Sequence, residues 1–228
     1  MQVKICGITN IADGRVAAEA GADLLGFNFY TKSPRYIEPA QVRDIVAELR
    51  AGSRCPKMVG VFVNEAPERV RAIMEAAQLD LVQLHGIEPA SAVRELSPRA
   101  YKALRPRDED EAHTAVAEYR EAANGSVPAF IVDAYDPKQF GGTGRHANWD
   151  IAAEIARQFP ILLAGGLNSE NVLDAIRIAQ PWGVDVSSGV ERTPGLKDHV
   201  KMRAFIRSAK SSQGREAEAS YLHSREVQ

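Results

Sequence analysis

The feature that most constrains this chain is a regular alternation of short apolar runs with segments of helical pattern. Eight apolar runs begin near residues 3, 24, 58, 81, 101, 129, 161 and 184, and such a segment follows each one. The runs are continuously apolar rather than alternately apolar and polar, which is typical of parallel strands buried on both faces. Eight consecutive strand–helix pairs predict an α/β fold, a single closed (β/α)8 TIM barrel with eight parallel strands inside eight outer helices.

An open, doubly wound sheet is the competing architecture for this alternation. Such a sheet rarely has eight consecutive crossovers, and its glycine fingerprint is missing from the first turn, at residues 7–10. We therefore expect one catalytic barrel domain over residues 1–210. Residues 211–228 are polar and have no continuous apolar face, so we expect them to form a loose tail.

The composition limits which binding partners and which cellular compartment we expect for the protein. The formal net charge of -2 gives no basic surface for nucleic acid, and no apolar stretch approaches the length of a membrane span. The two cysteines, Cys6 and Cys55, make no disulfide framework, and no apolar signal core precedes the first strand. These features predict a cytoplasmic protein, which we expect to be a monomer rather than a homodimer.

A cysteine and an aspartate end two of the predicted strands. Cys6 follows the apolar run that starts at Val3, and Asp133 follows four apolar residues. Active sites of such barrels lie at the carboxyl ends of the strands, where Asp133 suits a general acid or base across the mouth from Cys6. A thiolate at Cys6 requires a nearby positive charge or helix N-terminus, and Lys4 and the turn after Cys6 are the candidates. The alternatives are a buried core cysteine and a structural aspartate that caps a helix or pairs with a loop cation.

Glycine and serine gather after the last two predicted strands. Gly165 and Gly166 follow the seventh strand, and Ser187, Ser188 and Gly189 follow the eighth. In (β/α)8 barrels these two loops commonly form a phosphate site from backbone N–H groups and a helix N-terminus. Tight turns alone would also explain the glycines, but their presence in both loops favours a phosphorylated small-molecule substrate.

Two further polar residues lie at the predicted mouth. Arg35 is in a loop of polar and aromatic residues, where it is either solvated or able to hold a carboxylate by two parallel hydrogen bonds. His85 ends the fourth strand, and we interpret it as a polar wall of the pocket whose role is open. The five histidines have no metal-ligand spacing, and the chain has neither a Walker motif nor a dinucleotide fingerprint, so we expect no metal and no cofactor.

Several short stretches together resemble the phosphoribosylanthranilate isomerase family. They occur in the family's order between residues 3 and 191, and as a set they are highly specific. The resemblance weakens at residues 145–148, where the family more often has an aromatic–acidic pair, and the tail from residue 211 has no counterpart. The matching stretches are Lys4–Thr9, Gly26–Phe29, Ser33–Tyr36, Gly60–Asn64, Val82–Gly86, Asp133 with Gly141–Gly144, Ala164–Leu167 and Val184–Glu191.

This resemblance implies an aldose–ketose isomerase of tryptophan biosynthesis that needs no cofactor. The implied reaction is the Amadori rearrangement of N-(5-phosphoribosyl)anthranilate to 1-(2-carboxyphenylamino)-1-deoxyribulose 5-phosphate. It implies that Cys6 is the general base, that Asp133 is the general acid and that Arg35 holds the anthranilate carboxylate. The seventh and eighth loops would hold the phosphate, and Gly142 and Gly144 of the sixth loop would contact substrate.

Other functions remain open at the level of sequence. Another phosphosugar isomerase or synthase barrel is the alternative within the enzymes. The related histidine-pathway isomerase would require two aspartates where the first strand here has a cysteine, and indoleglycerol-phosphate synthase would require a lysine and glutamate constellation. A barrel that senses a phosphorylated metabolite without turnover is the alternative from another class, and the presence of both Cys6 and Asp133 argues against it.

Overall fold

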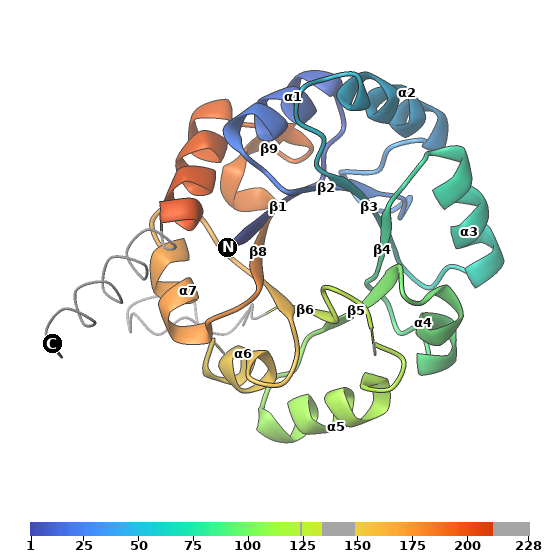
Figure 1. The fold of residues 1–228 in the computed structure, drawn as a ribbon, viewed down its shortest axis with the longest axis vertical. Helices are drawn as coiled ribbons and strands as arrows, with labels where there is room; N and C mark the ends of the chain where they lie inside the picture. The colour runs from blue at the N-terminus through green and yellow to red at the C-terminus, as the bar shows by residue number, and fades with distance from the viewer. Residues whose placement is uncertain (124, 134–148, 212–228) are drawn as a thin grey trace, which may run out of the picture.

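The computed structural model describes residues 1–123, 125–133 and 149–211. Its strands pair in parallel in chain order, and β8 also pairs with β1, which closes the barrel and excludes the open sheet. Figure 1 shows the helices as a ring outside the strands. The strands of the barrel are β1 (Gln2–Cys6), β2 (Leu24–Asn28), β3 (Lys57–Phe62), β4 (Leu81–Leu84), β5 (Ala100–Leu104), β6 (Phe130–Asp133), β7 (Ile161–Ala164) and β8 (Gly183–Val186).

Helices follow the strands as the sequence pattern predicts. A last helical segment covers residues 199–211. A short antiparallel pair, β9 (Glu191–Thr193) and β10 (Leu196–Lys197), lies between β8 and that segment. The labelled helices are α1 (Ile11–Ala20), α2 (Pro39–Arg50), α3 (Pro67–Ala76), α4 (Ala90–Leu96), α5 (Glu109–Tyr119), α6 (Trp149–Ala156) and α7 (Val172–Ala179).

Local signals in the sequence fix the ends of the first helices. The Asn10 side chain accepts a hydrogen bond from the Asp13 backbone N–H at 2.9 Å, which caps α1. Gly21 ends α1 in the left-handed region, with a φ of 105° that glycine adopts without strain. Pro39 supplies the first residue of α2, where its missing N–H costs nothing. Asn10, Gly21 and Pro39 are residue types that mark helix ends in a sequence.

Two apolar layers hold the barrel together. Successive side chains of a strand point to opposite faces, so Val3 and Ile5 of β1 pack toward the helices, where both are fully buried. Each such side chain contributes about 1.5–3 kcal/mol by leaving water. The alternate residues fill the interior of the barrel, which is a packed core rather than a pore. The inner cluster consists of Leu24, Val59, Leu81, Tyr101, Ala103, Ile131, Leu162 and Ala164.

The same alternation decides which side chains face the mouth at the carboxyl ends. Asp133 lies two residues beyond Ile131, a member of the inner cluster, and therefore also faces inward. The period of two likewise gives Cys6, His85 and Ser187 inward-facing positions at the ends of β1, β4 and β8. The fold thus brings side chains from distant parts of the sequence to one end of the barrel.

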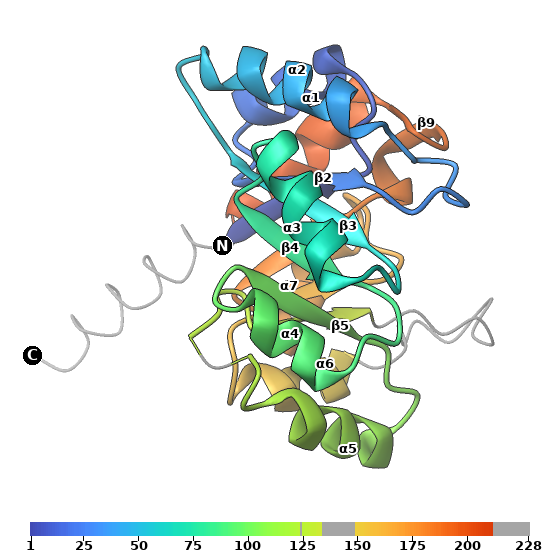
Figure 2. The same ribbon diagram turned by 90° about the vertical axis from the view of Figure 1, so that its right-hand side faces the viewer.

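The sequence pattern predicts a last helix from about Lys197 to Ser208, whereas the structure differs in the segment between β8 and that helix. This segment forms the β9–β10 pair, which lies at the opposite end of the barrel from the N-terminus (Figure 2). The Lys197 backbone N–H donates to Asp13 at 2.9 Å, which holds Lys197 outside the helix. The helix starts after Asp198, whose carboxylate accepts hydrogen bonds from backbone N–H groups of the first turn.

The structure describes the C-terminal part of the chain as far as residue 211. Among the described residues, no helix is both long and apolar enough to cross a membrane. The last helix includes Ser211, whose hydroxyl donates to the Ser208 carbonyl at 2.8 Å. Residues 212–228 of the expected tail lie outside the described part of the chain.

Candidate active site

A cavity of about 460 Å³ lies at the carboxyl ends of the strands. Its walls come from the ends of β4 and β6, from the loops after β2 and β7, and from the end of β8 with the segment that follows it. Gly142 and Gly144 fall in residues 134–148, outside the described residues. The other substrate residues named from the sequence, and the proposed acid, all line this cavity: Arg35, Asp133, Gly165, Gly166, Ser187, Ser188 and Gly189.

A second hollow of about 490 Å³ lies at the other end of the barrel and does not compete as a reaction site. Arg50, Asp80 and Arg99 line it, and Asp80 directly precedes β4, so this hollow lies at the amino ends of the strands. In (β/α)8 barrels that end serves stability rather than catalysis. The cavity at the carboxyl ends is therefore the candidate active site.

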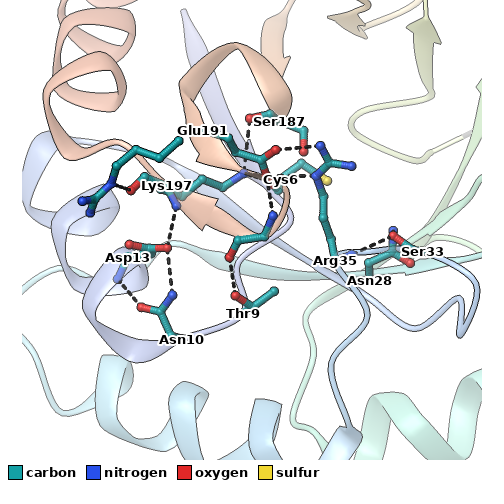
Figure 3. Close-up of polar contacts among 12 residues, drawn as sticks. Cys6, Thr9, Asn10, Asp13, Asn28, Ser33, Arg35, Ser187, Glu191 and Lys197 are labelled. Carbon is teal, nitrogen blue, oxygen red and sulfur yellow. Dashed lines mark hydrogen bonds and ion pairs between the residues drawn. The ribbon is translucent and has the colours of Figure 1, made fainter.

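Cys6 is half-buried at the end of β1. It is not among the described residues that line the cavity, but it lies near Arg35 and Ser187, which do (Figure 3). Gly7 follows with a φ of 76°, and a Cβ there would lie 2.6 Å from Cδ of Arg35 and 3.2 Å from Oγ of Ser187. A Cβ on Gly26 of the neighbouring strand would lie 2.9 Å from Sγ of Cys6. The two glycines therefore leave space for the thiol next to residues that line the cavity.

Burial dominates the acidity of the Cys6 thiol. It raises the pKa of Cys6, the ammonium groups of Lys4 and Lys197 oppose that shift, and the Asp185 carboxylate reinforces it. Lys4 thus acts in the direction predicted from the sequence, but its charge is outweighed. The net shift favours the protonated thiol, so a base at this position depends on both ammonium groups to keep some thiolate accessible.

A buried polar layer lies directly beneath the mouth, and sequence analysis missed most of it. The Lys4 ammonium donates to Oδ1 of Asp185 at 2.9 Å and to Oε1 of Gln83 at 2.8 Å. The Tyr101 hydroxyl donates to the same Gln83 oxygen at 3.1 Å. Although burial disfavours its charge, the Asp185 carboxylate raises the pKa of Lys4, which remains an ammonium. On three strands, a residue of this layer lies two positions before a site residue: Lys4 before Cys6, Gln83 before His85, and Asp185 before Ser187. This spacing places both side chains on the inner face of the strand and is the signal that could have revealed the layer.

Arg35 is held by a carboxylate of its own chain. Its Nε and Nη2 donate to the two oxygens of Glu191 at 2.9 and 2.6 Å, a planar two-bond contact (Figure 3). The Lys197 ammonium donates to the same carboxylate at 2.9 Å and to the Cys6 carbonyl at 2.5 Å. A guanidinium has five N–H groups, and this contact uses two of them. The contact of Arg35 with a substrate carboxylate stays a prediction.

The loops after β7 and β8 have the geometry of an anion cradle. Gly165 and Gly166 have φ values of 97° and 64°, which other residues rarely adopt. A Cβ on Gly189 would lie 2.0 Å from the Leu167 carbonyl oxygen, so glycine is required for the two loops to meet. Within the described residues, the buried Ser187 hydroxyl oxygen has no hydrogen-bond partner. These features suit close approach of an oxyanion, whereas binding itself stays a prediction.

His85 lines the cavity from the segment that follows β4, as a polar wall residue would. Its Nδ1 lies 2.8 Å from Nε2 of Gln83. Burial lowers the pKa of His85 to about 4, and the positive charges of Arg105 and Lys4 add to this shift. The imidazole is therefore neutral at physiological pH.

Comparisons with known proteins agree with this site. A model of the N-(5'phosphoribosyl)anthranilate (PRA) isomerase family matches residues 3–208. The N-(5'-phosphoribosyl)anthranilate isomerase of Pelobacter propionicus is 47% identical over 212 residues, which cover 93% of this chain and 97% of that protein.

Two solved structures are similar throughout the barrel. Monomers generated from the dimeric phosphoribosylanthranilate isomerase of Thermotoga maritima superpose with a TM-score of 0.79 at 40% identity, covering 92% of this chain and 99% of that one. A phosphoribosyl anthranilate isomerase in complex with reduced 1-(o-carboxyphenylamino)-1-deoxyribulose 5-phosphate gives the same TM-score of 0.79, identity of 40% and coverage of 92% and 99%. The barrel, the site and these relatives together show that this chain belongs to the N-(5'-phosphoribosyl)anthranilate isomerase family.

Proposed function

We propose that the protein catalyses the Amadori rearrangement of N-(5-phosphoribosyl)anthranilate to 1-(2-carboxyphenylamino)-1-deoxyribulose 5-phosphate in tryptophan biosynthesis. The observation that carries the assignment to particular residues is the placement of Cys6 and Asp133. Both occupy inward-facing positions at the carboxyl ends of β1 and β6. In the closed order β6-β7-β8-β1, two strands separate them, so the two side chains can flank a bound sugar.

The reaction requires one acid and one base. In this proposal the Asp133 carboxyl gives its proton to the furanose ring oxygen as the bond between that oxygen and C1 breaks, which leaves an iminium ion. The Cys6 thiolate then removes the proton from C2, and the electron pair of that C–H bond neutralises the iminium to give an enolamine. Tautomerisation of the enolamine gives the ketone. Each step moves only protons and electron pairs, as general acid–base catalysis does.

The phosphate group is assigned to the loops after β7 and β8. Support comes from the left-handed backbone of Gly165 and Gly166 and from the unpaired Ser187 hydroxyl among the described residues. Inorganic phosphate should then compete with substrate, and Gly166→Glu should raise KM sharply because it adds a side chain and a negative charge. Gly166→Ala controls for backbone strain, since it shares the unfavourable φ without the charge. Purely non-competitive inhibition by phosphate would contradict this site.

Turnover by the full chain tests the proposed function. The fluorescence of phosphoribosylanthranilate should disappear with time when the purified protein is added, and the loss should scale with protein concentration. Binding of the substrate without its consumption would instead identify a sensor of phosphorylated metabolites. No consumption and no binding would refute both functions.

Two further properties complete the proposal. We propose a cytoplasmic location, because the described Cys6 and Cys55 are free and a reducing compartment keeps a thiol base intact. Cell fractionation tests this location. A monomer remains our expectation, although a relative from Thermotoga maritima is dimeric. Light scattering of the purified chain decides between the two assembly states.

A further inference from the structure

The buried polar layer beneath the mouth contains one side chain whose orientation is fully determined. Oε1 of Gln83 accepts hydrogen bonds from the Lys4 ammonium at 2.8 Å and from the Tyr101 hydroxyl at 3.1 Å. An ammonium has only donors, so the Gln83 atom that faces Lys4 is the carbonyl oxygen and cannot be the amide nitrogen. The Asp185 carboxylate, 2.9 Å from Lys4, keeps that ammonium charged and in place. Nε2 of Gln83 is therefore the atom that faces His85.

This orientation fixes the tautomer of His85. The Gln83 Nε2 group has two N–H donors and no acceptor, and it lies 2.8 Å from His85 Nδ1. Nδ1 must then accept, which requires an unprotonated nitrogen. A neutral imidazole with a free lone pair on Nδ1 carries its proton on Nε2. The environment agrees, because burial and the nearby Arg105, Lys4 and Lys102 charges all disfavour the imidazolium form.

The remaining ring nitrogen is available to a ligand. Within the described part of the chain, no hydrogen bond involves His85 Nε2, and His85 lines the same cavity as Asp133. The anionic parts of the proposed substrate have other candidate partners, namely the glycine loops for the phosphate and Arg35 for the carboxylate. The sugar oxygens between them can accept a hydrogen bond from an uncharged donor such as a neutral imidazole.

We propose that His85 is a neutral Nε2–H donor to an oxygen of the substrate's sugar portion, and that Gln83 is the positioning residue that holds it in this tautomer. This inference rests on the proposed function. A neutral donor orients the sugar between Cys6 and Asp133 without adding a second acid near neutral pH. In this positioning role Gln83 acts through His85 and does not touch substrate.

Matched substitutions at position 85 separate the two ring nitrogens. In His85→Gln the amide nitrogen can reach the place of Nε2, whereas in His85→Asn it can reach only the place of Nδ1. We expect His85→Gln to keep kcat/KM within about threefold of wild type and His85→Asn to lose roughly tenfold, the loss that corresponds to one hydrogen bond. Equal activity of wild type and His85→Asn, or a greater loss in His85→Gln than in His85→Asn, would overturn the inference.

Nitrogen NMR of the imidazole gives a readout that does not depend on turnover. The wild-type His85 signals should be those of the neutral Nε2–H tautomer at neutral pH. Gln83→Glu should move the proton to Nδ1, because a carboxylate can only accept. An Nδ1–H or imidazolium signal in the wild type would refute the inference.

The outcomes for the inference and for the proposed function are distinct. If the wild type and the His85→Asn variant consume phosphoribosylanthranilate equally fast, the inference is refuted and the proposed function stands. A wild-type enzyme that shows the Nε2–H tautomer but consumes no substrate refutes the function.

Discussion

The buried pair of Lys4 and Asp185 allows a quantitative test of the polar layer. The Lys4 side chain is completely buried and the Asp185 side chain is 10% exposed, with 2.9 Å between nitrogen and oxygen. Lys4→Met preserves length but leaves the Asp185 carboxylate without its cation. Breaking such a pair from one side costs about 3–5 kcal/mol, because an uncompensated charge stays buried. We therefore expect this loss in the free energy of unfolding.

Urea denaturation followed by circular dichroism measures the effect, and a double-mutant cycle isolates the pair. Asp185→Asn alone should also destabilise, but added to Lys4→Met it should cost little more, because no buried charge then remains. Arg177→Met is a matched control, since its ion pair with Asp174 is 75% and 57% exposed and should contribute nothing measurable. A loss below about 1 kcal/mol in Lys4→Met, or additive losses in the double variant, would refute this reasoning.

Three other predictions concern pH, the arginine and the tail. His85 has an ordinary pKa of 6.5 and a folded pKa of about 4, so the unfolded chain binds more protons between these values. The free energy of unfolding should therefore fall by up to about 3 kcal/mol as pH drops through this window. In urea titrations, His85→Gln should not show this fall, and the same pH dependence in the wild type and in His85→Gln would contradict the prediction. Arg35→Lys should weaken transition-state binding by about 1.5–3 kcal/mol and lower kcat/KM accordingly, because a point charge replaces the planar fork. If kcat/KM changes by less than about twofold in both Arg35→Lys and Arg35→Ala, Arg35 has no such role. Deletion of residues 212–228 should leave folding and turnover nearly intact, whereas an insoluble or inactive product would show that the tail docks.

The barrel was predictable because its signals are local. Continuous apolar runs report burial on both faces of a strand, and residues such as Asn10, Gly21 and Pro39 mark helix ends by their own backbone chemistry. The place of the cavity was predictable once the strands were identified, because parallel strands bring their carboxyl ends together. Asp133 and the glycine loops could therefore be placed at one mouth before the structure was known.

The polar partnerships could not be predicted because they connect distant parts of the chain. Lys4 and Asp185 are 181 residues apart in sequence and meet only because β8 closes on β1. Arg35 and Glu191 are 156 residues apart, so nothing local indicates that the guanidinium already holds a carboxylate. Lys197 has the pattern of a helix start, yet the long-range bond of its backbone N–H to Asp13 places it in β10. The acidity of Cys6 was also out of reach, since burial and three surrounding charged groups, Lys4, Asp185 and Lys197, decide it.

The kcat of Cys6→Ser tests the central claim most directly. Serine nearly preserves the volume of the side chain but hardly ionises near neutral pH, so it cannot serve as the base. Cys55→Ser is the matched control, because Cys55 is the exposed thiol and lies in the segment before β3. If Cys6 is the base, Cys6→Ser should lose about 100-fold or more in kcat while remaining folded, and Cys55→Ser should match wild type. A Cys6→Ser enzyme that turns over at nearly the wild-type rate would contradict the account.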